Sequence, residues 1–139
     1  MRRNRKRNPY WLDVAQDKKV QNKTKLKFAS WNIRTMLDRQ NADRPERRSA
    51  IISLELSKYN IDIAALSEVR FSGTGHIREE AGYSIYWSGK AADERSESGV
   101  ALAIRTELAS KLIEEPKAVS DRMMTLRVPL SDDRWCTVI

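Results

Sequence analysis

Several kinds of residue are scarce in this 139-residue chain, and each scarcity excludes a class of protein. A single cysteine, Cys136, excludes an internal disulfide, as is typical of proteins in a reducing compartment. A single histidine, His76, cannot build a zinc site of histidines and cysteines, even together with that cysteine. No apolar run has the length of a signal peptide or a membrane span. We therefore expect a nuclear or cytoplasmic protein that is not secreted and does not enter a membrane.

Positive charge is concentrated at the start of the sequence. Residues 1–27 hold ten Lys and Arg against two Asp and Glu, a net charge of +8, whereas residues 28–139 hold 16 against 17, a net charge of −1. Residues 1–24 also carry too few apolar side chains to offset the entropy lost on ordering. We predict a flexible basic arm over residues 1–24 and one domain over residues 25–139.

A short basic run in this arm has two interpretations. It is either a solvated tail or a segment for nuclear import or phosphate binding, and a run of this length does not decide between them. Its basic residues are Arg2, Arg3, Arg5, Lys6 and Arg7.

The pattern of apolar residues predicts an α/β domain that begins with two parallel strands. Residues 25–33 alternate and then become apolar, which indicates a strand. Residues 61–67 are almost entirely apolar, as in a strand that is covered on both faces. With a helix between them, the two strands form a βαβ unit and pair in parallel.

A helix is predicted between these strands, over about residues 45–59. Asp43 and Glu46 form a helix-start signature around Pro45, and Asn60 can adopt the left-handed conformation that ends a helix. Apolar residues recur at spacings of three and four, which places them on one face towards the sheet. They are Ile51, Ile52, Leu54, Leu56 and Tyr59.

After residue 71 the pattern changes to short strands at close spacing, which is typical of antiparallel pairing. Residues 72–75 contain two glycines and are interpreted as a turn. The later elements expected are strands over 83–87, 99–105 and 123–130 and a short helix over 106–112. Residues 135–139 are apolar and β-prone, and we expect an edge strand there that allows self-association.

Each of the first two predicted strands delivers an oxygen ligand at its carboxyl end. Asn32 ends the first strand and Glu68 follows the second, and sites in α/β sheets form where strands end. Arg34 and Arg70 each stand two residues after one of these ligands, and residues i and i+2 of an extended chain point the same way. The oxygen ligands suit Mg²⁺ (or Mn²⁺), and the guanidinium groups suit a phosphate.

The same residues also have purely structural explanations, which the spacing alone leaves open. Asn32 can be a turn residue that caps its own backbone, and Glu68 can be a strand-end carboxylate paired with Arg70. His76 follows a glycine in a predicted turn and lacks the flanking residues of a catalytic histidine. The pair Asp121–Arg122 is interpreted as a turn or a surface ion pair in preference to a nucleic-acid contact.

Several segments together resemble a known family. Residues 28–34 (FASWNIR) and 62–70 (DIAALSEVR) are similar to the first two motifs of the endonuclease/exonuclease/phosphatase superfamily. Residues 98–104 (SGVALAI) resemble its next core strand, and residues 136–139 (CTVI) resemble the strand before its active-site tyrosine. Arg34 stands where the abasic-site nucleases of the family have an aspartate, which favours the branch of non-LTR retrotransposon endonucleases.

This resemblance implies a two-sheet α/β sandwich with outer helices and a Mg²⁺-dependent endonuclease that cleaves phosphodiester bonds in DNA. At the matching positions, Asn32 would contact the scissile phosphate and the metal site, and Glu68 would hold Mg²⁺ (or Mn²⁺). The family's tyrosine, its Asp-x-Asn pair and its late Asp-His pair would all follow Ile139. We therefore expect an incomplete domain and an inactive, retrotransposon-derived fragment. Two alternatives stay open: a non-catalytic remnant that binds nucleic acid or protein, and a phosphoesterase acting on small phosphate esters.

Overall fold

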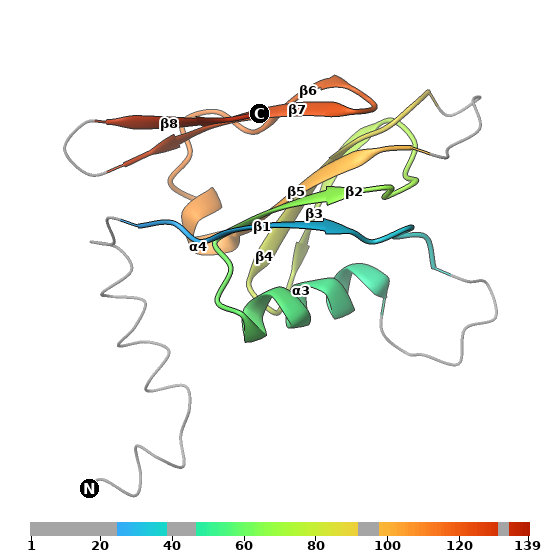
Figure 1. The fold of residues 1–139 in the computed structure, drawn as a ribbon, viewed down its shortest axis with the longest axis horizontal. Helices are drawn as coiled ribbons and strands as arrows, with labels where there is room; N and C mark the ends of the chain where they lie inside the picture. The colour runs from blue at the N-terminus through green and yellow to red at the C-terminus, as the bar shows by residue number, and fades with distance from the viewer. Residues whose placement is uncertain (1–24, 39–46, 92–97, 131–133) are drawn as a thin grey trace, which may run out of the picture.

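A computed structural model describes residues 25–38, 47–91, 98–130 and 134–139, which form two β-sheets and two helices (Figure 1). The strand order is β1-β2-β5-β4-β3 in the larger sheet and β6-β7-β8 in the smaller one. The strands are β1 (Phe28–Asn32), β2 (Ile63–Ser67), β3 (Thr74–Glu79), β4 (Tyr83–Ser88), β5 (Val100–Arg105), β6 (Lys117–Ser120), β7 (Met123–Pro129) and β8 (Trp135–Val138). The helices are α3 (Arg48–Lys58) and α4 (Thr106–Ala109).

The parallel pair predicted at the start of the domain is confirmed. β1 and β2 pair in parallel, with Phe28 opposite Ile63 and Asn32 opposite Ser67. The other ladders among the described strands are antiparallel, as the short, closely spaced strands indicated. The fold is thus mixed α/β, with one mixed sheet and one antiparallel sheet.

The five-stranded sheet lies between α3 on one face and the three-stranded sheet on the other (Figure 1). β5 shows how its sequence serves both faces: Ala101 and Ala103 join the core under α3, whereas Leu102 and Ile104 join the core between the sheets. Alternate residues of a strand point to opposite faces, so this small and large alternation fits a close helix on one side and a second sheet on the other.

Helix α3 begins later than the sequence predicts. Arg47 is still extended (ψ 153°), so the helix starts at Arg48 and the expected start near residue 45 is wrong. The N–H of Arg48 instead donates to Oδ1 of Asp38 at 2.8 Å, which satisfies one of the free donors of the first turn. The signature at Asp43 and Glu46 lies outside the described residues.

The buried face of α3 also differs from the predicted one. Leu54 and Tyr59 are 46% and 65% exposed, so their assignment to the core is wrong. The buried residues of the helix recur at spacings of three and four and face the sheet, and half of them are serines. They are Ser49, Ile52, Ser53 and Leu56. Ile52 and Leu56 share a core cluster with alanines of the sheet, and the hydroxyl of Ser49 donates to buried Glu79. The left-handed stop is confirmed, since Asn60 has φ 57°.

Two strands were missed because their composition carries no strand signal. β3 is a polar edge strand whose residues are mostly exposed or half-buried, and it starts at Thr74, so the predicted turn over 72–75 is wrong at its end. β6 is short and fully exposed. Both depend on pairing with a neighbour, β4 or β7, and not on their own apolar pattern. None of the helices in the described residues has the length and apolarity needed to cross a membrane.

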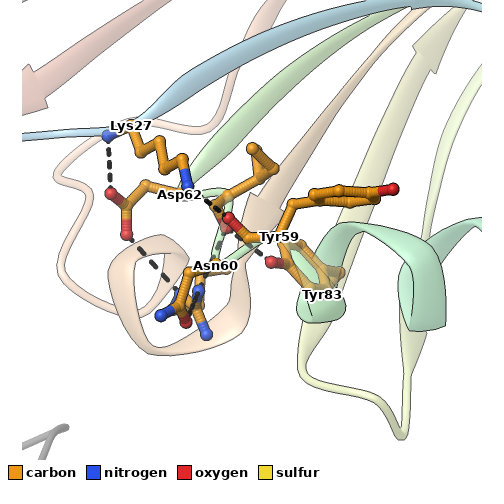
Figure 2. Close-up of polar contacts among 7 residues, drawn as sticks. Lys27, Tyr59, Asn60, Asp62 and Tyr83 are labelled. Carbon is orange, nitrogen blue, oxygen red and sulfur yellow. Dashed lines mark hydrogen bonds and ion pairs between the residues drawn. The ribbon is translucent and has the colours of Figure 1, made fainter.

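A buried carboxylate fastens the end of the sheet where β1 and β2 begin (Figure 2). Asp62 is 2% exposed, and its Oδ2 accepts the backbone N–H of Lys27 at 2.7 Å. Its Oδ1 lies 3.5 Å from Nε of Arg105, at the end of β5. The Nζ of Lys27 donates to the carbonyl of Tyr59 at 2.7 Å. One side chain thereby links segments that are far apart in sequence.

The carbonyl of Ile61 is a second junction at this end. It accepts the hydroxyl of buried Tyr83 at 2.5 Å and Nη2 of Arg105 at 3.2 Å. The same Nη2 donates to Oδ1 of Asn60 at 3.3 Å, and the guanidinium lies 5.5 Å from the ring centroid of Tyr83. This network holds the end of the sheet opposite the candidate site.

Candidate metal and phosphate site

The structure brings Asn32 and Glu68 to the same edge of the five-stranded sheet, namely the edge formed by the carboxyl-terminal ends of β1 and β2. Because β1 and β2 run in parallel and Asn32 pairs with Ser67, the residue after Ser67 lies beside the end of β1. The two predicted ligands therefore leave adjacent strand ends, as a shared site requires. Their roles as ligands stay predictions.

The chain at these strand ends is not extended, contrary to the assumption made from the spacing. Arg34 (φ 66°), Glu68 (φ 56°) and Arg70 (φ 61°) all adopt the left-handed conformation. Non-glycine residues rarely adopt it, and such residues cluster at functional sites where the surrounding structure imposes them. The argument that positions i and i+2 point the same way is wrong here, although both arginines are exposed beside the strand ends.

The side chain of Asn32 is oriented by its own backbone. Its Oδ1 accepts the N–H of Arg34 at 3.1 Å, which is the self-capping turn considered from the sequence. This bond uses one of the two acceptor positions of the amide oxygen and leaves the Nδ2 donors free for a phosphate oxygen. A structural turn and a phosphate contact are thus compatible in the same residue.

Glu68 is half-buried, and its carboxylate is not paired with Arg70. The ion pairs recorded among the described residues do not include Glu68. A carboxylate that forms no ion pair with another described residue is a suitable hard-oxygen donor for Mg²⁺, which takes one or two carboxylates and keeps several waters. Glu68, with Asn32 at the neighbouring strand end, therefore fits the modest demand of the implied ion.

Three backbone hydrogen bonds hold the segment that follows Glu68. The carbonyl of Val69 accepts from Met36, just beyond β1, at 2.9 Å. The N–H of Val69 donates to Gly99 at 3.1 Å, and the N–H of Arg70 donates to Ser98 at 2.9 Å. Val69 itself is fully buried, so the turn that presents Glu68 is anchored on both sides.

Within the described residues, no three His, Cys, Asp or Glu side chains come together as a metal site. His76 lies on edge strand β3, not in a turn as the sequence suggested, and it stacks on Tyr86 with ring centroids 5.5 Å apart. Tyr83, at the start of β4, is fully buried. Asp121 and Arg122 form the turn between β6 and β7.

The basic run of the arm lies outside the described residues. Its members are Arg2, Arg3, Arg5, Lys6 and Arg7. Their expected contact with nucleic acid and the flexibility of residues 1–24 stay predictions.

Comparison with known proteins decides the family. A sequence profile of the Endonuclease/Exonuclease/phosphatase family matches residues 29–133. The chain belongs to this family. Two similar relatives are craniofacial development protein 2 of Tragulus javanicus, 29% identical over 100 residues, and that of Bos taurus, 28% identical over 100 residues. Each match covers 72% of this chain and 15% of the relative, so the chain spans only a small part of their length. No solved structure matches.

Family membership confirms the resemblance identified from residues 28–34 and 62–70. The profile match begins at the second residue of β1 and covers both strand ends at the candidate site. The roles of Asn32 and Glu68 within the family stay predictions. The feature that sequence reasoning missed is the set of left-handed residues at this edge, because no glycine marks those positions.

Proposed function

We propose that this chain forms the metal- and phosphate-binding part of a Mg²⁺-dependent endonuclease domain that acts on DNA and derives from a retrotransposon. The observation that supports it best is the parallel pairing of β1 and β2, which brings Asn32 and Glu68 to one edge. Arg34 and Arg70 add exposed positive charge beside them. In this proposal the two sheets and α3 are the first part of the family's two-sheet sandwich with outer helices.

Each residue of the edge has a distinct task in the proposed reaction. A bound Mg²⁺ supplies charge stabilisation on the phosphate and on the leaving oxygen. Glu68 holds the ion through its carboxylate. Asn32, whose amide is fixed by the N–H of Arg34, donates from Nδ2 to a phosphate oxygen. The guanidinium groups of Arg34 and Arg70 offset the phosphate charge and orient the substrate backbone.

None of the described residues is assigned the role of general base in this proposal, and among them no three His, Cys, Asp or Glu side chains gather at one place. Positioned proton transfer is typically worth about 10² to 10⁴ in rate. We therefore propose that the 139-residue chain alone does not cleave DNA. A chain of this kind can still bind nucleic acid or a protein as a non-catalytic remnant.

The test uses a chimera in which residues 25–139 replace the matching part of a related complete nuclease. We expect Mg²⁺-dependent nicking of plasmid DNA, and we expect Glu68→Gln to abolish it while leaving the melting temperature unchanged. Glu80→Gln, in the exposed turn after β3, is the matched control and should retain activity. Undiminished nicking in Glu68→Gln would contradict the ligand role. Hydrolysis of small phosphate esters without nicking would instead support a phosphoesterase.

We propose that the arm supplies most of the non-specific affinity for DNA. Residues 1–27 carry a net charge of +8 and the remainder −1, so counterion release should come mainly from the arm. Deleting residues 1–24 should flatten the slope of log affinity against log salt. An unchanged slope would show that the binding charge lies within the domain.

We also propose self-association through an edge strand. β8 is an edge strand of the smaller sheet and carries a partly exposed Trp135, and edge strands present free backbone groups to other chains. Sedimentation over a range of concentrations should show a dimer that Thr137→Pro abolishes, because Thr137 and Arg127 form a non-hydrogen-bonded pair and proline removes a backbone donor that faces the free edge. A monomer at all concentrations would contradict this self-association.

We propose a nuclear or cytoplasmic location for the protein, which imaging of the tagged full chain tests.

A further inference from the structure

We propose that Ser98 and Asp121 act as a positioning pair that fixes the segment carrying Glu68; the inference rests on the metal role proposed for that residue. Ser98 lies just before β5, and Asp121 lies in the turn between β6 and β7, so the pair joins the two sheets. The hydroxyl of Ser98 donates to Oδ2 of Asp121. Neither residue touches the proposed metal, and both act through the backbone.

Two more hydrogen bonds fasten the same turn to the edge of the larger sheet. The N–H of Gly99 donates to the backbone carbonyl of Asp121 at 3.1 Å. The hydroxyl of Ser88, at the end of β4, donates to the carbonyl of Ser120 at 2.6 Å. The turn is therefore held at three points, and one of them depends on the Asp121 side chain.

Ser98 and Gly99, which are bonded to the turn between β6 and β7, also hold the segment that follows Glu68. The carbonyl of Gly99 accepts from Val69, and the carbonyl of Ser98 accepts from Arg70. Glu68 and Arg70, on either side of Val69, are both left-handed, a conformation that persists only where the surrounding structure imposes it. These hydrogen bonds supply that restraint.

At Gly99 the segment before β5 packs directly against the segment that follows Glu68. Gly99 has φ 108°, and a Cβ at this position would lie 2.9 Å from Cγ2 of Val69 and 3.3 Å from the nitrogen of Arg70. The two segments are thus in direct contact, so a shift at Ser98 and Gly99 must move Val69 and Arg70 as well.

The charge of Asp121 suits an acceptor role. The hydrogen bond from Ser98 lowers the pKa of its carboxyl below the usual value, and the nearby cations Lys90 and Arg122 act in the same direction. The group is ionised at neutral pH, and hydrogen bonds to ionised acceptors are stronger than those between neutral groups.

The experiment measures amide hydrogen exchange of Val69 and Arg70 by NMR, together with Mn²⁺ affinity, in the full 139-residue chain. Asp121→Ala and Ser98→Ala should each speed exchange at these two amides and weaken Mn²⁺ binding about three- to tenfold, the effect of losing one ordinary hydrogen bond. Asp121→Asn keeps an oxygen acceptor for Ser98 and should restore both values to nearly wild type.

A serine outside this region provides the matched control. The hydroxyl of Ser110 donates to the carbonyl of Glu107 at 2.7 Å beside α4, so Ser110→Ala should change neither the exchange at Val69 and Arg70 nor Mn²⁺ affinity. If Asp121→Ala does not fold, Ser98→Ala carries the test, since it removes the same bond from the other side.

The outcomes separate this proposal from the proposed function. Unchanged exchange at Val69 and Arg70 in both alanine variants overturns the positioning pair. Faster exchange throughout both sheets, with Mn²⁺ affinity unchanged, also overturns it, because that result describes a general structural role. If Mn²⁺ binds equally to wild type and Glu68→Gln, the proposed metal role fails, and the positioning of the Glu68 segment is then decided by the exchange rates alone.

Discussion

Replacing Asp62 by alanine should destabilise the domain strongly. The substitution leaves the part-buried N–H of Lys27 without its acceptor and takes away the carboxylate beside Arg105, whose side chain is only 20% exposed. A buried donor without a partner costs about 1–3 kcal/mol, and breaking a buried ion pair from one side costs about 3–5 kcal/mol. Arg105 keeps its bonds to Ile61 and Asn60, which favours the lower end of this range.

We therefore expect a loss of about 3 kcal/mol for Asp62→Ala, which corresponds to a fall of about 10 to 15 °C in melting temperature for a domain of this size. Urea unfolding followed by circular dichroism measures the loss. Asp62→Asn keeps an oxygen acceptor for Lys27 but loses the charge, and it should cost roughly half as much.

Glu55→Ala is the surface control for this prediction. Glu55 pairs with Lys58 at 3.0 Å, and both side chains are well exposed, so the change should stay within about 0.5 kcal/mol. If Asp62→Ala cost no more than Glu55→Ala, the view that the buried carboxylate holds the strand starts together would be refuted.

Two further predictions concern groups at opposite ends of the sheet. Burial raises the pKa of the Tyr83 hydroxyl above its usual value of 10; Arg105 lowers it in part, and Asp62 raises it further. The contribution of this group to folding stability should therefore be present below pH 10 and be lost as the pH rises through the folded pKa. Tyr83→Phe should lose this alkaline dependence, and a pH profile identical to wild type would contradict the prediction. Gly99→Ala places a Cβ against Val69 in a left-handed backbone, so it should lower the free energy of unfolding, measured in urea, by about 1–3 kcal/mol. An unchanged free energy of unfolding would show that the segment around Gly99 yields easily.

The sequence predicted the central strands and the parallel pair because their apolar patterns reflect burial directly. Residues 61–67 are apolar because most of them are buried, with Ala64 and Leu66 in the core under α3 and Ile63 in the core between the sheets, and β2 occupies residues 63–67 of this run. Edge strands β3 and β6 escaped notice because nothing covers them well enough to require an apolar pattern. Pairing partners distant in the chain determine them.

The face of α3 shows a different limit. Counting apolar residues put Leu54 and Tyr59 in the core, whereas the structure buries Ser49 and Ser53. These serines lie on the same face as Ile52 and Leu56, and the hydroxyl of Ser49 finds an acceptor in buried Glu79 at 2.5 Å. Complementarity between two surfaces is not visible in either sequence segment alone.

At the candidate site, the sequence predicted which residues lie at the strand ends but not how they are held. The spacing of Asn32 and Glu68 on two parallel strands was sufficient to place them at one edge. The left-handed conformations of Arg34, Glu68 and Arg70 could not be foreseen, because residues of these types seldom adopt them without a tertiary restraint. Around Glu68 and Arg70, Ser98 and Gly99, far along the chain, hold the backbone through the N–H groups of Val69 and Arg70, whereas the N–H of Arg34 is held by the side chain of Asn32.

The central claim is that Asn32 and Glu68 form one divalent-metal and phosphate site, and Mn²⁺ titration followed by NMR tests it most directly. Mn²⁺ broadens the signals of nuclei near its binding site. In the 139-residue chain, low Mn²⁺ should first broaden the side-chain amide of Asn32 and the backbone amides of residues 68–70, and Glu68→Gln should remove this selectivity. Broadening that begins elsewhere, or that persists unchanged in Glu68→Gln, would contradict the assignment of the site.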